Sequence, residues 1–391
     1  MKFKAYKFKL EPNEIQKDFI NKTIGCSRLI YNCMLYEKQE KYKNEDESKC
    51  KTEKEYKLEY EFLKDVDSIA LQQARIDLRK AYKNFFRKLK NKQKTSIKYK
   101  SKKNPKNSYR TINVNNSIRI KDSYIKLPKL GFVKLKKSRE VQGKIKSVTI
   151  TKNILNQYYV SILCEVEIKS LVKINKNLGI DLGIKDFAIT SDGEKIANPR
   201  CLKKSLGRLK CLQRRASRKK KGSSNRKKAN FRVAKVHNKI TNQRSDFLHK
   251  LSTKLIRENQ TICLEDLNVS GMIKNHKLAQ AISDVSWSKF VDMIKYKAEW
   301  YGKNIIQINR FSPSSKMCNS CGWINKDLTL KDRTWKCKSC DEEVDRDINA
   351  AKNILDLGFH PKNLVHAGIE HNKKIYSPTD GGVEPVELSG R

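Results

Sequence analysis

Apolar and charged residues nearly alternate at the start of the chain and then change to a helical spacing. Over residues 2–10 the alternation slips by one position after Ala5, which predicts a short edge strand that ends before Pro12. From about residue 14 to residue 92, apolar residues recur every three or four positions, opposite a basic face. This spacing predicts a helical domain with one wet, positively charged side.

The alternating pattern returns in the next part of the chain. A lysine-rich, proline-containing segment at 94–107 is typical of a linker. After it, the stretches YRTINVNN, SIRIKDSYIKLPKLGFVKLKK, GKIKSVTITKN and NQYYVSILCEVE have a period of two, which is typical of strands. We therefore expect a small antiparallel sheet or barrel, which the N-terminal strand joins across the helical insertion.

From Asn177 the pattern indicates an α/β arrangement. LGIDLGIKDFAITSDGEKI predicts two strands separated by a turn, and QTICLEDLNV and KNIIQINRF each predict another apolar strand. Residues 199–244 are rich in Lys and Arg and contain no acidic residue, and the stretch DFLHKLSTKLIREN that follows predicts an amphipathic helix. Residues 359–391 show no clear period, so we expect a tail of uncertain order. Its histidines at 360, 366 and 371 are too loosely spaced to predict a metal site.

The excess of positive charge points to a polyanionic partner. Lys and Arg number 86 against 42 Asp and Glu, which gives a formal net charge of +44. Nucleic acid is the polyanion that best balances such a chain, and a general solubility effect of lysine is the alternative. The N-terminus lacks the apolar core of a secretory signal, and no run of about 18 apolar residues occurs. We therefore expect a cytoplasmic, nucleoid-associated protein that does not enter a membrane.

Four of the eleven cysteines have the spacing of a metal site. Cys318, Cys321, Cys337 and Cys340 form C-x2-C-x15-C-x2-C, which predicts one structural Zn²⁺ held by four thiolates. Four thiolates leave no open position for water, so this zinc is expected to fold a small segment rather than to catalyse. Asp341 stands where such ribbons usually carry glycine, and an Asp there has to adopt a left-handed backbone conformation. The other cysteines are scattered and are expected to be reduced packing residues.

Carboxylates occupy three notable places in the α/β part. Asp181 lies within the first apolar strand, and Glu265 ends the strand in QTICLEDLNV. Asp345 and Asp347 lie where a helical pattern begins. An ionised acid inside an apolar strand costs on the order of several kcal/mol unless a cation meets it. That cation is either a buried Lys or Arg, or a pair of Mg²⁺ (or Mn²⁺) ions, which activate water for phosphodiester hydrolysis.

The order of these segments resembles a known nuclease site. LGIDLGIKDFA, ICLEDLNV and DRDINAAKNI look like the three segments of a RuvC-like site on an RNase H fold. More closely, these segments together with KVHNKITNQRSDFLHKLSTKLI and FSPSSKMCNSCG resemble the transposon-encoded TnpB (OrfB-type) family of RNA-guided DNA endonucleases, which is related to type V CRISPR effectors. The resemblance covers most of residues 1–358. It implies that Asp181, Glu265 and Asp347 are the catalytic acids and bind two Mg²⁺ (or Mn²⁺) ions, whereas Asp345 caps the helix.

The resemblance also implies a domain plan and partners. We expect an RNase H-like (RuvC) nuclease domain with an inserted zinc ribbon, and a strand-rich wedge barrel that is interrupted by a helical recognition domain. The expected ranges are wedge 1–12 and 101–172, recognition domain 13–100, nuclease domain 173–315 and 343–358, and zinc ribbon 316–342, which would bind target nucleic acid. The implied partners are a noncoding guide RNA and a target DNA with a short flanking motif, and the protein itself is expected to be a monomer.

Basic residues near the nuclease segments are candidate phosphate contacts, with a solvated loop as the alternative. In the acid-free segment these candidates are Arg208, Arg214, Arg215, Lys219, Lys220 and Lys221. Four aromatic residues of the helical domain either stack on bases or belong to its core. They are Tyr31, Tyr36, Phe85 and Phe86.

Three other functions agree with part of these patterns. A nuclease-inactive RNA-guided repressor would keep the nucleic-acid surfaces but lose acids, and all three acids are present. A guide-free transposase or nuclease would keep the acids and act without bound RNA. A purely structural zinc-ribbon DNA binder would explain the cysteines and the charge, but it leaves Asp181 without a reason.

Overall fold

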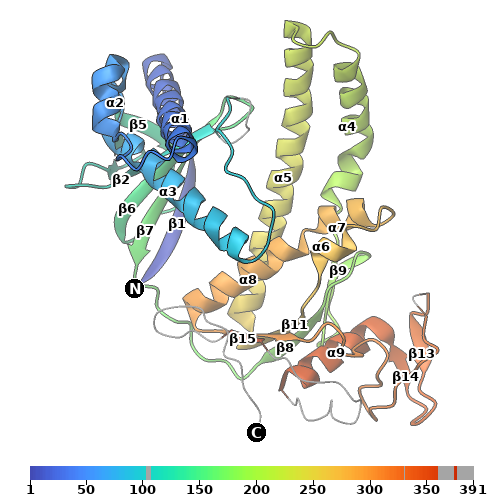
Figure 1. Cartoon of the computed structure of the whole chain (residues 1–391). Coiled ribbons are helices and arrows are strands. Elements are labelled where there is room, and N and C mark those ends of the chain that lie inside the picture. Colours follow the sequence, from blue (N-terminus) through green and yellow to red (C-terminus); the bar gives the residue numbers. More distant parts are fainter. Residues whose placement is uncertain (103–106, 330, 360–373, 377–391) are drawn as a thin grey trace. The chain divides into compact units, whose positions relative to one another are not determined.

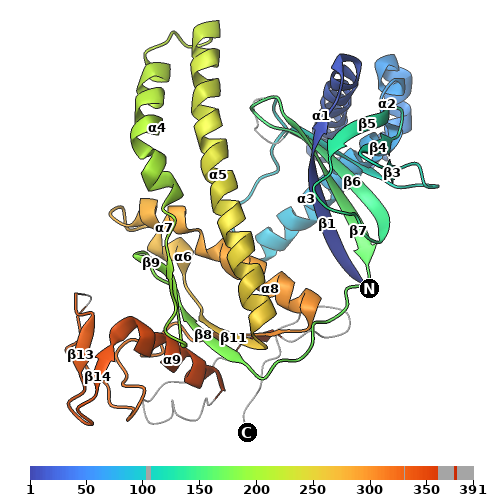
Figure 2. The same cartoon turned by 180° about the vertical axis from the view of Figure 1, so that it is seen from behind.

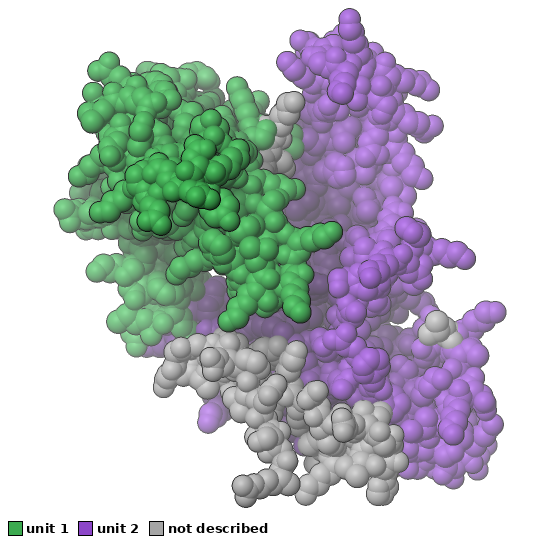
Figure 3. All heavy atoms as spheres, viewed as in Figure 1, with its two compact units in different colours: residues 1–167 green, residues 168–391 purple. Residues whose placement is uncertain are grey.

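The computed structural model describes residues 1–102, 107–329, 331–359 and 374–376. The chain divides into two compact units, unit 1 at 1–167 and unit 2 at 168–391 (Figure 3). The histidines at 360, 366 and 371 lie outside the described residues.

Unit 1 contains a seven-stranded antiparallel sheet with the strand order β2-β6-β7-β1-β5-β4-β3 (Figures 1 and 2). Its strands are β1 Lys2–Glu11, β2 Asn107–Ile112, β3 Arg119–Lys121, β4 Tyr124–Leu127, β5 Gly131–Lys136, β6 Lys144–Lys152 and β7 Tyr158–Val166. Each predicted alternating stretch therefore contributes to one sheet, which the first strand joins as expected.

β1 lies inside this sheet, so the prediction of an edge strand was wrong. It pairs with β7 along most of its length and with β5 at its end. The alternation also runs without a slip, since Tyr6, Phe8 and Leu10 are at most 2% exposed whereas Phe3, on the opposite face, is 56% exposed. The apparent slip arose because Phe3 and Ala5 are apolar residues on the exposed face.

Helices are inserted between β1 and β2, as predicted. They are α1 Glu14–Lys43, α2 Glu53–Glu59, the short 3₁₀ helix η1 Glu61–Lys64 and α3 Ser68–Lys90. A capping box begins α1, because the Asn13 side chain accepts a hydrogen bond from the Gln16 backbone N–H and the Gln16 side chain accepts one from the Asn13 N–H. Tyr31 is buried in the core of these helices, whereas Tyr36 and Phe86 are exposed. Of the aromatic candidates, Tyr31 is therefore a core residue.

Unit 2 is built around a six-stranded sheet with the order β10-β9-β8-β11-β12-β15. Its strands are β8 Asn177–Asp181, β9 Asp186–Thr190, β10 Lys195–Ala197, β11 Thr261–Glu265, β12 Asn304–Ile308 and β15 Lys374–Tyr376. β8, β11 and β12 are parallel to one another, and β9, β10 and β15 extend the sheet antiparallel. The central strands are continuously apolar because helices cover both faces of the sheet.

Unit 2 also contains helices, some of which cover the two faces of this sheet (Figures 1 and 2). They are α4 Cys201–Ser217, α5 Ser224–Glu258, α6 Val269–Met272, α7 Ala279–Val285, α8 Trp287–Tyr301 and α9 Arg346–Phe359. On one face α5 and α8 share a core with the sheet, for example through Phe290 and Leu178. On the other face α9 packs on the sheet through Ile354 and Cys263. The described chain between β12 and α9 contains the small hairpin of β13 Thr334–Lys336 and β14 Glu343–Asp345.

The acid-free segment folds into the long helical hairpin of α4 and α5, which extends away from the sheet (Figure 2). The run SRKKKGSSNRKK spans the end of α4, the turn at 218–223 and the start of α5, so it is loop only in its middle. At the base of the hairpin, Asp284 of α7 accepts a hydrogen bond from the Leu202 backbone N–H at 3.0 Å and pairs with Arg244 at 2.9 Å. Asp284 thus satisfies a free N–H of α4 and joins both helices to the sheet domain.

None of the described helices is long and apolar enough to cross a membrane. Among the scattered cysteines, Cys26, Cys164, Cys201 and Cys263 are buried, as expected of packing residues. Cys50 is exposed, because the irregular segment between α1 and α2 leaves it on the surface, so the prediction of a packing role was wrong at this position.

A buried lysine in unit 2 is expected to make stability depend on alkaline pH. The Lys297 ammonium donates hydrogen bonds to the His249 carbonyl, Ser252 Oγ and Thr253 Oγ1 at 2.9, 2.7 and 2.7 Å. Burial lowers its pKa from 10.5 to about 8, so above pH 8 the unfolded chain holds a proton that the folded chain has released. The free energy of unfolding should therefore rise between pH 8 and 10.5, by on the order of 2 kcal/mol from this group.

The variant Lys297→Met isolates this contribution, because all other titrating groups are common to both proteins. Denaturant unfolding of wild type and variant at pH 8 and pH 10 should show a steeper rise for the wild type. Parallel pH dependences would contradict the assignment.

Candidate active site

Two of the predicted acids lie at the same edge of the unit 2 sheet. β8 and β11 are parallel neighbours, and Leu264 lies opposite Ile180. Asp181 and Glu265 follow these two residues and are the last residues of their strands. Because the carboxyl ends of parallel strands meet at one edge, the register alone brings the two carboxylates together.

The third acid is placed by the close packing of α9 against β8. Gly179 approaches α9 so closely that an added Cβ atom would lie 2.0 Å from the Ala351 carbonyl oxygen. Asp181 lies two residues beyond Gly179 on the same face of the strand, and Asp347 lies one helical turn before Ala351. The absence of a side chain at Gly179 therefore brings the start of α9, with Asp347, to the edge that carries Asp181 and Glu265.

Asp345 has the capping role that was predicted for it. Its Oδ1 accepts hydrogen bonds from the backbone N–H groups of Asp347 and Ile348 at 3.0 and 3.1 Å, at the point where α9 begins. Its other carboxylate oxygen pairs with Lys195 at 2.7 Å. Both oxygens are thus engaged, which leaves Asp347 as the acid of this pair whose charge acts on Asp181.

The negative charges of Glu265 and Asp347 act on the carboxyl group of Asp181. Burial, followed by the negative charges of Glu265 and Asp347, raises the pKa of Asp181 to about 7. Burial also raises the pKa of Glu265, against the effect of the hydrogen bond that the Ser314 hydroxyl donates to it. Asp347 pairs with Arg333 at 3.3 Å, while no ion pair joins Asp181 to a Lys or Arg among the described residues. Arg346 lowers the pKa of Asp181 without offsetting the effect of burial, so among the described residues this carboxylate has a nearby positive charge but no direct Lys or Arg partner.

The three carboxylates are suited to a hard divalent cation, but they are not closed into a tight cluster. At least one pair of their oxygens lies more than 4.8 Å apart, since only the four thiols of Cys318, Cys321, Cys337 and Cys340 meet that limit among the described residues. The donors are all carboxylate oxygens at a crowded, partly buried edge, which is the ligand chemistry of Mg²⁺ or Mn²⁺. The set therefore fits such ions in composition.

The four cysteine thiols fit a single zinc ion. Cys318 Sγ lies 3.8 Å from Cys340 Sγ, and Cys321 Sγ lies 3.6 Å from Cys337 Sγ. Tetrahedral coordination with Zn–S bonds of about 2.3 Å requires sulfur atoms about 3.8 Å apart. A backbone N–H of Trp323 lowers the pKa of the Cys321 thiol, whereas burial raises the pKa of the Cys318 thiol. Asp341 has φ 58°, the left-handed conformation expected where ribbons usually carry glycine.

Similarity to known proteins decides the family. A protein of Streptomyces pristinaespiralis, named as a candidate RNA-guided DNA endonuclease, is 39% identical over 366 residues, 91% of this chain and 89% of that protein. InsQ of Escherichia coli K12, with the same description, is 28% identical over 99% of this chain and 98% of its own length. The chain belongs to the TnpB (OrfB) family.

Family profiles agree with this membership, and a solved structure has a similar fold. Profiles of the TnpB group match residues 161–276 (OrfB of IS605, described as a probable transposase), 1–47 (the helix-turn-helix domain of OrfB) and 287–354 (the TNB domain of Cas12f1-like proteins). The structure of Cas12f1 in complex with a single guide RNA and target DNA is 15% identical and has a TM-score of 0.58. It covers 88% of this chain and 83% of Cas12f1, which supports a common fold.

The hairpin of α4 and α5 in this TnpB protein, called the basic hairpin below, carries exposed positive charge. The candidates Arg208, Arg214, Arg215, Lys219, Lys220 and Lys221 are all exposed. Within the described chain, none of these six makes an ion pair, whereas Arg244 at the base of the hairpin does. The hairpin therefore presents unpaired positive charge along its outer half.

Several residues that contact the acids were not anticipated. Ser314, in the stretch FSPSS, donates to Glu265, and Arg333, between the two cysteine pairs, contacts Asp347. FSPSS had served only to recognise the TnpB family, and Arg333 is one basic residue among many. Their contacts depend on how the chain around the four cysteines packs against the strand and helix that carry the acids. No local sequence pattern could therefore have identified them.

Proposed function

We propose that this protein is an RNA-guided DNA endonuclease of a mobile element, which cuts DNA matched to a noncoding guide RNA by metal-dependent hydrolysis. The observation that supports it most is the convergence of Asp181, Glu265 and Asp347 at one sheet edge, where no described Lys or Arg forms an ion pair with Asp181 and the charge of Arg346 does not offset the burial of this carboxylate. The family relatives named as candidate RNA-guided DNA endonucleases agree with it. Such an enzyme would act at the nucleoid.

In this proposal each acid has a distinct role. Asp181 would contact both of two Mg²⁺ or Mn²⁺ ions, and Glu265 and Asp347 would each contact one of them. When bound, such ions activate water and stabilise the leaving oxygen of a phosphodiester. The Ser314 hydroxyl orients the Glu265 carboxylate, and the pairing of Asp347 with Arg333 has to give way for that carboxylate to bind metal.

Zinc has a structural role in the proposal. Cys318, Cys321, Cys337 and Cys340 supply four thiolates, so the ion has no open position for substrate or water. The segment they enclose has a small apolar core of its own, which includes Trp335, and zinc binding supplies the remaining folding energy.

The basic hairpin is proposed to contact nucleic-acid phosphates. Replacing both Arg214 and Arg215 by glutamine should weaken binding of nucleic acid similarly for all sequences and reduce the slope of log K against log salt by about 0.7–0.9 for each phosphate that the variant no longer neutralises. Binding of labelled guide and target measured between 50 and 200 mM salt tests this. The control is Lys250→Gln with Lys254→Gln, which lie on the same hairpin but are already paired with Asp246 and Glu194. Equal slopes for wild type and the arginine variant would remove the hairpin from the interface.

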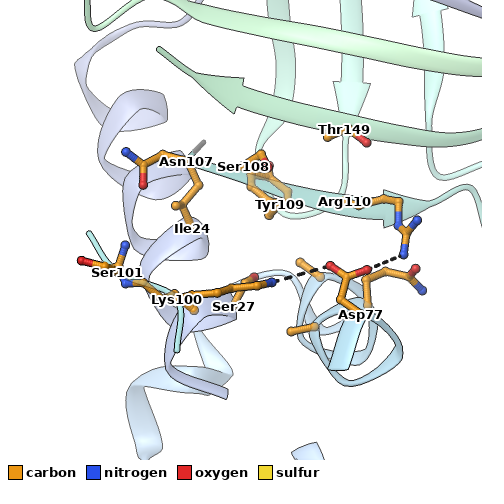
Figure 4. Close-up of a pocket in the computed structure, with 14 residues that line it drawn as sticks. Ile24, Ser27, Asp77, Lys100, Ser101, Asn107, Ser108, Tyr109, Arg110 and Thr149 are labelled. Carbon is orange, nitrogen blue, oxygen red and sulfur yellow. Dashed lines mark hydrogen bonds and ion pairs between the residues drawn. The ribbon is translucent and has the colours of Figure 1, made fainter. Parts of the chain in front are cut away.

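A cavity in unit 1 is proposed to read a base of the flanking motif. It has a volume of about 370 Å³ and lies between α1, α3 and β2 (Figure 4). Asp77 holds two cations at its wall, with Arg110 at 2.9 Å and Lys100 at 3.7 Å. Ser27 and Gln73 also line it and are 7% and 5% exposed, and the buried Ser27 Oγ has no hydrogen-bond partner among the described residues. Buried polar groups without partners are costly unless a ligand satisfies them.

Gln73→Ala tests this placement. Because an amide pairs with a base edge through two hydrogen bonds, its loss should reduce discrimination at one motif position by about 1–3 kcal/mol and leave guide RNA binding unchanged. Target binding is measured on a library of flanking sequences. An unchanged sequence preference would exclude Gln73 from base readout.

The function itself is tested by purifying the protein, expressed with the DNA that flanks its gene, and sequencing the RNA that copurifies. The complex is then given matched and mismatched DNA with Mg²⁺, and its mass shows whether one protein chain binds each RNA. Cutting of matched DNA alone, dependent on the RNA, would support the proposal. Binding of matched DNA without cutting would favour a repressor, and cutting without RNA would favour a guide-free transposase or nuclease.

A further inference from the structure

One face of α9 is polar yet almost completely buried. Asn349 and Asn353, one turn apart, are 3% and 0% exposed, and both side chains face the segment that leads into the first cysteine pair. Asn353 Nδ2 donates to the carbonyl oxygens of Ser314 and Met317 at 2.7 and 2.6 Å, and Asn349 Nδ2 donates to that of Met317 at 2.7 Å. Two primary amides thus satisfy backbone groups that would otherwise be unpaired in the interior.

These amides fix both neighbours of a zinc ligand. Met317, which precedes Cys318, accepts from both asparagines. Asn319, which follows it, donates its backbone N–H to Asn349 Oδ1 at 2.9 Å and its side-chain amide to Asn353 Oδ1 at 3.1 Å. The position of the Cys318 thiol is therefore tied to the same helix that carries Asp347.

The hydrogen bonds of Asn353 also lead to Glu265, the second of the proposed catalytic acids. Asn353 holds the backbone carbonyl of Ser314, and the hydroxyl of Ser314 donates to the Glu265 carboxylate. Ser314 is 3% exposed, so its hydroxyl cannot form a hydrogen bond with bulk water in place of the one with Glu265. A continuous series of hydrogen bonds thus leads from the residues beside Cys318, through Asn353, to Glu265.

We propose that Asn349 and Asn353 are positioning residues that couple the zinc site to the metal-binding carboxylates of the nuclease. When the segment that carries the four cysteines is folded, the hydrogen bonds of Asn349 and Asn353 hold Ser314 against Glu265. They thereby keep the Glu265 carboxylate aligned with Asp181 and Asp347. When the segment loosens, Ser314 withdraws and Glu265 loses its orientation. The proposal rests on the proposed nuclease function, and it assigns to the structural zinc an effect on the affinity of a different metal site.

The test is a double-mutant cycle on the complex of full-length protein and guide RNA. Asn353→Asp replaces two donated hydrogen bonds by a carboxylate facing two carbonyl oxygens, and Ser314→Ala removes only the contact with Glu265. Each variant should need about tenfold or more Mg²⁺ for half-maximal cleavage of matched DNA. The double variant should need no more Mg²⁺ than the single variant with the higher Mg²⁺ requirement, because both changes break the same connection. The control is Lys352→Ala, since Lys352 is the exposed neighbour of Asn353 on α9.

Zinc content per chain and binding of matched DNA are measured for every variant. Asn353→Asp should retain both, and if it loses zinc, Asn349→Ala, which removes a single donor and acceptor, takes its place in the cycle. The coupling would be overturned if the asparagine variants needed no more Mg²⁺ than the wild type. It would also be overturned if the increases in Mg²⁺ requirement of the two single variants added up in the double variant. If the wild-type complex itself binds but does not cut matched DNA, the proposed function fails, and that result is separate from either outcome of the cycle.

Discussion

Asp181→Asn should abolish cleavage of matched DNA, by about a thousandfold or more, while guide RNA and target DNA still bind. The reason is that the substitution keeps the shape of the side chain but removes the charge that two metal ions would share. Cleavage is measured under single-turnover conditions with Mg²⁺ in excess, and target binding by the same complex in parallel. Asp192→Asn is the control, because Asp192 forms a half-exposed ion pair with Lys176 at 2.8 Å, and such pairs contribute little.

The same substitution should raise the melting temperature of the metal-free protein. The folded pKa of Asp181, about 7, lies above its ordinary value of 3.8, so the folded state is penalised as pH rises from about 4 through 7 and carries the full penalty at pH 8. Asparagine has no charge to bury beside Glu265 and Asp347. A loss of activity with a gain in stability identifies an acid kept for function. A variant that melts earlier, or that still cuts, would contradict this role.

Gly179→Ala should lower the cleavage rate by about a hundredfold without touching any carboxylate. The added methyl group would lie 2.0 Å from the Ala351 carbonyl and 2.9 Å from atoms of Leu355, so α9 has to move away from β8. Asp347 moves with the helix, and a displacement of about 1 Å at a reacting group costs on the order of a hundredfold in rate. The rate is measured on matched DNA, together with the temperature of unfolding.

Gly207→Ala is the matched control for this change. Gly207 lies within α4, and a methyl group added there meets nothing within 4 Å, so the control should keep the wild-type rate and gain a little helix stability. Equal rates for Gly179→Ala and wild type would mean that the contact between β8 and α9 does not set the position of Asp347.

The acids were predictable because local pattern and final position coincide for them. Asp181 and Glu265 each interrupt or end an apolar strand, and parallel strands bring such ends together whatever the rest of the chain does. The cysteine spacing is informative for a similar reason, since a zinc site uses short, regular separations. What could not be predicted are contacts made between distant segments, such as those of Ser314 with Glu265 and of Asn353 with the chain before Cys318.

The pattern at the N-terminus misled for a different reason. A lysine-rich strand looks like an edge strand, but β1 carries lysines on both of its faces while its backbone pairs with strands on both sides. Side-chain polarity indicates which face of a strand is exposed to solvent, but it does not indicate whether the backbone pairs with one neighbouring strand or two. The acid-free segment shows the same limit, since its charge was evident, whereas its hairpin depends on Asp284 of α7.

The central position of β1 has a consequence for biosynthesis. β1 is made before the other strands of its sheet, and its main partner, β7, ends at Val166. At translation rates of 5–20 residues per second, the strand waits roughly 10–30 s with Tyr6, Phe8 and Leu10 unpaired. During this interval α1 to α3 can already form, because their contacts are local. Until β7 is made, β1 therefore remains an apolar strand without its main partner, which exposes it to pairing with other chains.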